Sequence, residues 1–242
     1  MDWAEHFTTQ HHKQTPYDSI SQVEAEVDMG LAYKIQQAFV QRMGLPVAGY
    51  KAALTAPAAQ AAMGADQAIA GVLYEAGHFA AGHLDLSQPC MLETEIGFTA
   101  ATQVTQPVSA TDVFSHMTTC HPMIEVASPN LAGKPNGIDL VATNAASFGY
   151  IKGPAHPIRE DLDEITIEFE VDGETLHTAR AGDVMGSQAN ALAWLVNLLL
   201  ELGYTIQPGH LFMTGSIGAM HPAKPGQYKA SYGSLGQIEF AI

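Results

Sequence analysis

The alternation of hydrophobic and polar residues divides the chain into helices and strands. Apolar residues that recur every three or four positions are typical of an amphipathic helix, and Gly203 ends the clearest of these runs. Helices are predicted over residues 28–43, 57–63, 138–148 and 187–202. Strict alternation, or a short apolar run between turn residues, is typical of a strand instead. Strands are predicted over residues 47–54, 92–101, 123–126, 165–171, 174–180, 210–214, 228–232 and 237–242.

The order of these segments shows no internal repeat and no linker. Asp172-Gly173 lies between two predicted strands, and this residue pair is typical of a two-residue hairpin turn. The mixture of strands with a few helices favours one α+β domain, in which the helices pack on a strongly bent sheet or roll. We assign residues 28–242 to this domain and residues 1–27 to an N-terminal lead-in. Residues 1–20 are polar and rich in histidine, and we expect them to fray.

Composition and charge narrow the class of protein. The chain has 242 residues, of which 47% are hydrophobic, so it can bury a core without disulfide bonds. Its formal net charge of −15 argues against nucleic acid and anionic membranes as partners and is compatible with a cation site. Cys90 and Cys120 form no CxxC pair, and neither a targeting segment nor a membrane span is visible. We therefore expect a cytoplasmic protein.

Two glutamates on one predicted strand are the first candidates for chemistry. Glu93 and Glu95 are two positions apart, so both side chains point to the same strand face. Two buried carboxylates repel each other, and a divalent cation reverses that cost. Glu125, in the apolar strand 123–126, adds a third oxygen ligand, and such a set suits Mg²⁺ or Mn²⁺ better than Zn²⁺. The alternative is a solvated strand face, which is the commoner arrangement for an isolated Glu-x-Glu pair.

Lys51 is the next candidate, because it stands among alanines and a leucine in the predicted strand 47–54. A lysine in such surroundings can pair with a substrate carboxylate or take part in proton transfer. It can equally lie on an edge strand and extend its ammonium group into water. Other catalytic patterns are weak, since the histidines lack zinc-ligand spacing and no serine has the G-x-S-x-G context of a hydrolase.

Seven short segments, taken together and in order, carry a family resemblance. They are residues 32–36 (AYKIQ), 49–55 (GYKAALT), 92–98 (LETEIGF), 124–126 (IEV), 144–147 (NAAS), 190–195 (NALAWL) and 214–217 (TGSI). The set spans roughly residues 28–242 and resembles the fumarylacetoacetate hydrolase superfamily. Within that superfamily it is most similar to the 2-keto-4-pentenoate hydratase and 4-oxalocrotonate decarboxylase family.

The resemblance implies a mixed, strongly bent β-roll with peripheral helices. It implies a divalent metal, Mg²⁺ or Mn²⁺, held by Glu93, Glu95 and Glu125, with Lys51 as a catalytic residue that moves a proton. A 2-hydroxydienoate or its 2-oxo form would chelate the metal through its C1 carboxylate and C2 oxygen, and the metal would stabilise the enolate. The resemblance also assigns substrate contacts to Leu54, Ile69, Asn144, Ser147, Gly215 and Ser216. Members of the family tend to form homo-oligomers, and we expect the same of this chain.

One departure from the family pattern bears on the reaction. Hydratases of the family carry an aspartate in a Pro-Asp-Tyr-Gly-like motif, whereas Ile69 stands at that position in the corresponding residues 67–71. Asp66, three positions earlier, is the candidate catalytic acid only if the loop is rearranged. Ile69 therefore favours decarboxylation over hydration.

Three functional hypotheses follow. The first is a metal-dependent lyase for short 2-oxo or 2-hydroxydienoic acids, either a hydratase or a decarboxylase. The second is a carbon–carbon bond hydrolase of the acylpyruvase type, which requires His78, His83 or His121 to approach the glutamates in space. The third is a non-catalytic homologue that binds a dicarboxylate, a possibility motivated by Ile69.

Overall fold

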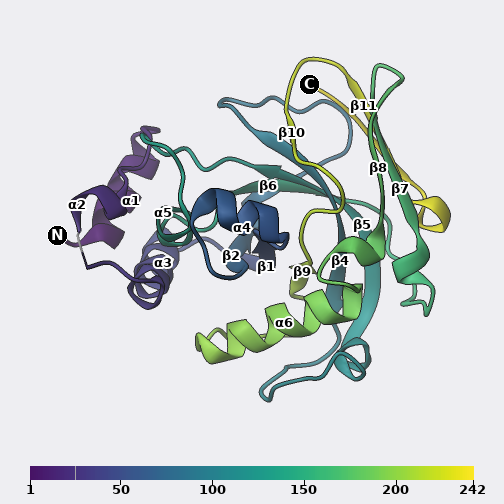
Figure 1. Ribbon diagram of the computed structural model, residues 1–242, viewed down its shortest axis with the longest axis horizontal. Helices are drawn as coiled ribbons and strands as arrows, with labels where there is room; N and C mark the ends of the chain where they lie inside the picture. Colours follow the sequence, from purple (N-terminus) through teal and green to yellow (C-terminus); the bar gives the residue numbers. More distant parts are fainter. Residues whose placement is uncertain (25) are drawn as a thin grey trace.

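Two β-sheets form the frame of the protein, whose computed structural model describes residues 1–24 and 26–242 (Figure 1). The larger sheet has the order β2-β1-β9-β4-β5-β6-β3, and β10 pairs with β4. Its strands are β1 (Val47–Ala53), β2 (Ile69–Tyr74), β3 (His78–Phe79), β4 (Met91–Ala100), β5 (Met117–Ala127), β6 (Ser147–Lys152), β9 (Leu211–Met213) and β10 (His221–Pro222). The smaller sheet, in the order β12-β11-β7-β8, consists of β7 (Thr166–Val171), β8 (Glu174–Arg180), β11 (Gln227–Ser231) and β12 (Gln237–Ala241).

The larger sheet is strongly bent. Its edge strand β2 is held near β6 by side chains rather than by strand pairing. Asn144 accepts a hydrogen bond from Val72 N and donates one to Val72 O, and Ser147 also donates to Val72 O. These bonds satisfy backbone groups that an edge strand otherwise leaves open. The predicted α+β fold with a bent β-roll is therefore confirmed.

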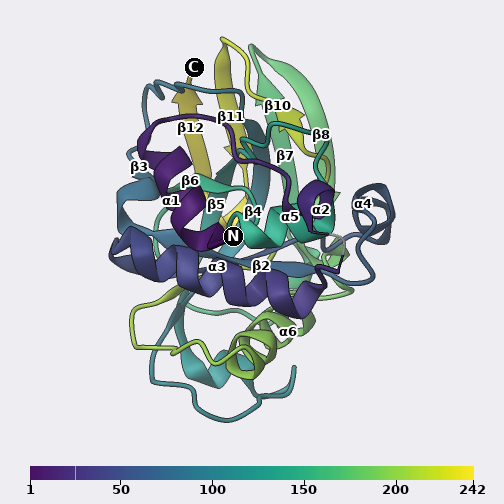
Figure 2. The same ribbon diagram turned by 90° about the vertical axis from the view of Figure 1, so that its left-hand side faces the viewer.

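The helices lie around the sheets, most of them at one end of the molecule (Figures 1 and 2). They are α1 (Trp3–His12), α2 (Ile20–Val23), α3 (Met29–Met43), α4 (Pro57–Met63), α5 (Gly137–Ala142) and α6 (Gln188–Glu201). Short 3₁₀ helices cover Glu75–Gly77, Val113–His116, Leu162–Glu164, Ala181–Asp183 and Gly233–Leu235. Asp28 caps α3 through Leu31 N, and Ser187 caps α6 through Asn190 N, which is why the patterns located both helices closely.

The expectation that residues 1–20 fray is wrong. Asp2 caps α1, and the helix buries Trp3 and Phe7, which are four positions apart and share one face. The Phe7 ring lies 6.0 Å from the ring of Phe39 in α3. Tyr17 is buried as well. A few apolar side chains in a mostly polar segment therefore anchor it to the rest of the protein. The division between a lead-in and a domain at residue 28 stays a prediction.

The helix predicted over residues 138–148 ends six residues early, at Ala142. Three successive residues, Asn144 to Ala146, have positive φ angles of 69°, 52° and 58°. This left-handed turn reverses the chain, brings the Asn144 side chain to β2 and starts β6 at Ser147. Strand β5 is also longer than the predicted 123–126, because β4 pairs along its whole length. Strands β2, β3, β6 and β10 were not predicted.

The main hydrophobic core lies between the two sheets and α6 and includes Leu92, Ile96, Ile124 and Val126. A second cluster joins α1, α3 and α5 to the start of β2. Both cysteines are buried and free. None of the helices in residues 1–24 and 26–242 combines the length and the hydropathy needed to cross a bilayer.

Candidate metal centre

Three glutamates meet on the face of the larger sheet that points away from the main core. Glu93 in β4 lies directly opposite Glu125 in β5, and Glu95 follows on the same face of β4. The alternate residues Leu92, Ile96 and Ile124 point to the core instead. One carboxylate oxygen of each glutamate lies within 4.8 Å of those of the other two. The strand period of two and the β4–β5 register thus create a cluster of oxygen ligands.

Lys51 reaches the same cluster from β1. Its Nζ atom lies 2.6 Å from Glu125 Oε1, and both side chains are only 2% exposed. Strand β1 lies between β2 and β9, so the edge-strand alternative for Lys51 is wrong. Gly71 in β2 pairs directly with Lys51 in β1. A Cβ atom on Gly71 would lie 2.9 Å from Asn144 O and 3.4 Å from Lys51 Cε. The missing side chain of Gly71 leaves room for the lysine.

Burial excludes the solvated strand face as an interpretation of the Glu-x-Glu pair. Glu95 and Glu125 are buried, and Glu93 is partly exposed. Glu95 Oε2 accepts a hydrogen bond of 2.8 Å from Gly215 N. Its Oε1 atom is buried and has no hydrogen-bond partner among the described residues. A buried carboxylate oxygen without a donor is costly, and a cation removes that cost.

The electrostatics of the cluster also fit a divalent cation. Burial raises the pKa of Glu93 to about 7, and repulsion from Glu125 adds to the increase. Burial, followed by repulsion from Glu125 and Glu93, holds the pKa of Glu95 well above its usual range. Burial opposes the charged form of Lys51, but attraction to the glutamates outweighs it and raises the lysine pKa. Because one ammonium group faces three carboxylates, the cluster suits an ion that prefers oxygen ligands, such as Mg²⁺ or Mn²⁺.

A segment after β9 closes one side of the cluster. Thr214 donates from Oγ1 to Ile96 O at 3.0 Å, and Ile217 N donates to Thr94 O at 2.8 Å. Gly215, between them, binds Glu95. The Ser216 hydroxyl group is buried beside these contacts, and its interaction with the Glu93 carboxylate partly opposes the rise in the Glu93 pKa. Of the residues that the resemblance assigned to substrate, Gly215 and Ser216 are thus brought to the glutamates.

The other predicted substrate residues lie in different surroundings. Ile69 shares the strand face of Gly71 and Lys51 and is buried in the second hydrophobic cluster. Leu54 directly follows β1, in a left-handed conformation with a φ angle of 53°. Asp66 is exposed ahead of β2, and it makes no side-chain hydrogen bond or ion pair with any described residue. The structure therefore does not bring Asp66 to the cluster.

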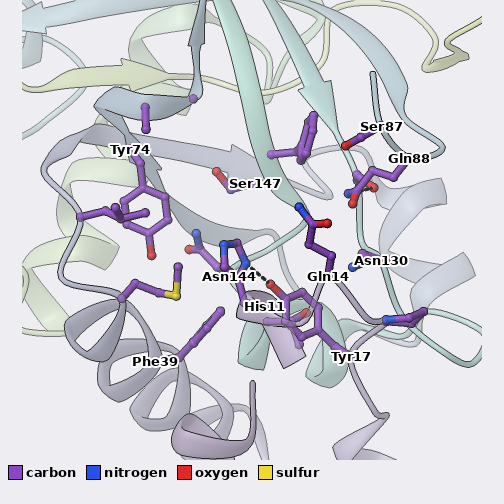
Figure 3. Close-up of a pocket in the computed structure, with 18 residues that line it drawn as sticks. His11, Gln14, Tyr17, Phe39, Tyr74, Ser87, Gln88, Asn130, Asn144 and Ser147 are labelled. Carbon is purple, nitrogen blue, oxygen red and sulfur yellow. Dashed lines mark hydrogen bonds between the residues drawn. The ribbon is translucent and has the colours of Figure 1, made fainter. Parts of the chain in front are cut away.

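Asn144 and Ser147 hold Val72, as described above, and they also line a cavity of about 560 Å³ (Figure 3). His11 and Tyr17 from the N-terminal segment face this cavity and hydrogen bond to each other at 2.8 Å. Neither the three glutamates nor Lys51 lines it. The substrate contacts assigned to Asn144 and Ser147 stay a prediction.

Thr94 and Gly71 contribute to the site and were not predicted from the sequence. Thr94 stands between the two glutamates of β4, so strand alternation alone places it on the opposite face, where it holds Ile217. Gly71 is the glycine of the stretch aligned with the hydratase motif. That it leaves room for Lys51 follows only from the pairing of β1 with β2.

Solved structures of other proteins share this fold. No family model matches the chain. Fumarylpyruvate hydrolase from Pseudomonas aeruginosa, solved with Mn²⁺ and pyruvate, shares the fold with a TM-score of 0.63 and 15% identity, over 82% of this chain and 89% of the other. 4-Oxalocrotonate decarboxylase from Pseudomonas putida, solved with magnesium and adipate, superposes with a TM-score of 0.91 and 27% identity, over 99% and 95% of the two chains. The protein thus has the fumarylacetoacetate hydrolase-like fold.

Relatives in sequence show the family within this fold. The chain is 31% identical to a 4-oxalocrotonate decarboxylase of Pseudomonas putida over 226 residues, which cover 88% of this chain and 85% of the relative. It is 30% identical to a 2-keto-4-pentenoate hydratase of Burkholderia vietnamiensis over 223 residues, or 87% and 85% of the two chains. The chain belongs to the 2-keto-4-pentenoate hydratase and 4-oxalocrotonate decarboxylase family.

Proposed function

We propose that the protein is a divalent-metal-dependent lyase that acts on short 2-oxo or 2-hydroxydienoic acids. The observation that carries the proposal is the cluster of Glu93, Glu95 and Glu125 oxygens within 4.8 Å of one another, next to buried Lys51. Membership of a family whose relatives are named hydratase and decarboxylase supports the reaction class.

Glu93, Glu95 and Glu125 would hold the ion, Mg²⁺ or Mn²⁺. When bound, the ion supplies Lewis-acid stabilisation for the negative charge that develops on a 2-oxo acid. Lys51, whose Nζ atom lies 2.6 Å from Glu125 Oε1, would be the group that moves a proton to or from the substrate carbon chain. The buried Ser216 hydroxyl group, which lies near Glu93, would be the donor to the substrate carboxylate, since Gly215 N already binds Glu95.

Between the two family reactions, we favour decarboxylation. Addition of water to an alkene needs an acid or base near the distal carbon atoms. Ile69 is apolar and buried at the position of the hydratase acid, and Asp66 is exposed. Loss of CO₂ needs only the electron sink at the 2-oxo end, so the absence of an acid at residue 69 does not hinder it. The substrate would then be a dicarboxylate.

The hydrolase hypothesis lacks a base in contact with the glutamates. His121 lies close to Thr99 Oγ1, Thr119 Oγ1 and Gly153 O, and burial lowers its pKa to about 4. His78 is exposed and stacks on Tyr150. No hydrogen bond or ion pair among the described residues joins a histidine to Glu93, Glu95 or Glu125. The cytoplasmic location and homo-oligomeric assembly stay predictions.

The test is mass analysis of the product formed from 2-hydroxymuconate or its 2-oxo tautomer, with Mg²⁺ and with chelator. We expect loss of CO₂ only when metal is present, and no turnover by Glu93→Ala, which should still fold. Gain of water instead would assign the hydratase reaction. Full activity in chelator or in the folded Glu93→Ala variant would overturn the metal-dependent proposal.

A further inference from the structure

A chain of hydrogen bonds joins the two sheets directly behind the glutamates. Thr94 lies between Glu93 and Glu95 in β4, points away from them and is fully buried. Its Oγ1 atom lies 2.7 Å from Ile217 O and 3.1 Å from Nε2 of His177 in β8. Nδ1 of His177 lies 2.8 Å from Nε2 of His221 in β10. The chain thus runs from the smaller sheet to the segment that binds Glu95.

The proton positions in this chain follow from its final acceptor. Ile217 O is a carbonyl oxygen, so Thr94 donates its single hydroxyl proton there. Thr94 Oγ1 can then only accept from His177, which requires the proton of that ring to be on Nε2. The bare Nδ1 atom accepts from Nε2 of His221. His177 is neutral in this arrangement, and burial, which lowers its pKa, favours that form.

Packing holds the His177 ring in place. The planes of His177 and His221 differ by 12°, with centroids 5.0 Å apart, and the short N–N distance shows that the rings meet edge to edge. Gly218 closes the other side. Its φ angle is +86°, and a Cβ atom there would lie 2.4 Å from His177 Cδ2, so only glycine allows this approach. The ring is fixed against the segment that follows Ser216.

This segment connects the two faces of β4. Thr94 holds Ile217 through both backbone groups, since Ile217 N donates to Thr94 O and Ile217 O accepts from Thr94 Oγ1. Two residues earlier, Gly215 N donates to Glu95 Oε2. The position of Ser216 depends on both attachments, one to each face of the strand.

We propose that His177 is a positioning residue for the reaction. By donating to Thr94 it fixes the 215–217 segment and thereby the place of the Ser216 hydroxyl group beside the metal centre. The inference rests on the proposed function, in which Ser216 contacts the substrate carboxylate. The β4–β5 pairing sets the backbone positions of the three glutamates, and Gly215 contacts only one of them, so loss of the His177 donor should weaken substrate binding much more than metal binding.

The experiment compares His177→Ala, His177→Gln and the control Thr178→Ala, which lies on the exposed side of the same strand. Hydrogen exchange of residues 214–218 is measured in the presence of Mg²⁺, together with KM, kcat and the Mg²⁺ affinity. We expect His177→Ala to speed exchange and raise KM by about fivefold to tenfold, as for one lost hydrogen bond, with kcat and Mg²⁺ affinity within about twofold. His177→Gln keeps an N–H donor, so its exchange rate and KM should lie close to those of the unmodified protein. Thr178→Ala should match the unmodified protein.

Several results would overturn the inference. They are unchanged exchange and KM in His177→Ala, an equal effect of Thr178→Ala, and a His177→Gln variant no better than His177→Ala. If His177→Ala fails to fold, His177→Leu fills the same space without an N–H donor, leaves the bond from Thr94 to Ile217 intact and should produce the same faster exchange and higher KM. If the unmodified protein turns over no dienoic acid, the proposed function fails, while the exchange measurement still decides the role of His177.

Discussion

Asp139 in α5 and Glu95 in β4 are both buried carboxylates, with 1% and 0% exposure, but the fold surrounds them in opposite ways. Asp139 accepts hydrogen bonds of 2.8 to 2.9 Å from Ser21 N, Ser21 Oγ and Asn136 Nδ2, so both of its oxygens have donors. Glu95 receives one hydrogen bond, from Gly215 N, and its other oxygen receives none within the described residues.

This difference separates a carboxylate that stabilises the fold from one that is available to a ligand. Asp139 ties α2 to α5, and its charge is balanced by donors from the chain itself. At Glu95 the cost of burial is increased by two further carboxylates, and Lys51 neutralises only one of the three. The negative charge of this cluster is neutralised only when a cation binds, and in the proposed function that cation is the divalent ion.

The largest expected effect is on activity. Glu95→Gln keeps the shape of the side chain but removes its charge, and we expect metal-dependent turnover to fall about a thousandfold, or ~4 kcal/mol of transition-state stabilisation. The melting temperature of the metal-free protein should stay the same or rise, because repulsion is relieved. Steady-state kinetics and thermal unfolding check both parts. Retained turnover in this variant would remove the distinction between Glu95 and a structural carboxylate.

Loss of the Lys51 charge should come next in size. Lys51→Met leaves Glu125 buried without its partner, and breaking such a pair costs about 3 kcal/mol of unfolding free energy. Mg²⁺ should recover much of this loss, because the ion balances the same carboxylates. Urea unfolding with and without Mg²⁺ measures the difference. An equal loss in both conditions would indicate that Lys51 acts by packing alone.

Asp139→Asn should affect stability and not the metal. The change removes charge-assisted hydrogen bonds to Ser21 and Asn136, and we expect a loss of about 2 kcal/mol in unfolding free energy. The Mg²⁺ affinity, measured by calorimetry, should be unchanged. Asp85→Asn, at an exposed position, is the matched control and should leave both quantities unaltered. A weakened Mg²⁺ affinity in Asp139→Asn would show that the two regions are coupled.

The stability of the metal-free protein should also depend on pH. Burial raises the pKa of Glu93 to about 7, above its unfolded value near 4.5, so the folded state binds the proton more tightly. The metal-free protein should therefore lose stability as the pH rises from about 5 to about 8. Mg²⁺ should raise the melting temperature more at pH 8 than at pH 5. A flat profile without metal would contradict the raised pKa.

Local patterns predicted much of the fold and failed where the chain turns. The capped helices α3 and α6, and the strands on either side of Asp172-Gly173, formed within one residue of the predicted bounds. The helix predicted over residues 138–148 ran past its true end into the start of β6, because the left-handed run from Asn144 to Ala146 has no reliable signature in non-glycine residues. The N-terminal helix was overlooked because its apolar positions, such as Phe7, are few and find their partners in α3.

Residue types and their local spacing set the faces of the strands. A strand repeats every two residues, so Glu93 and Glu95 share one face and Thr94 takes the other in any fold that keeps the strand. Only the tertiary structure decided that Glu125 pairs opposite Glu93, that Lys51 is buried beside it, that Asp66 stays in solvent and that His177 reaches Thr94. Spacing along a strand follows from backbone geometry, whereas register and burial depend on which distant segments pack together.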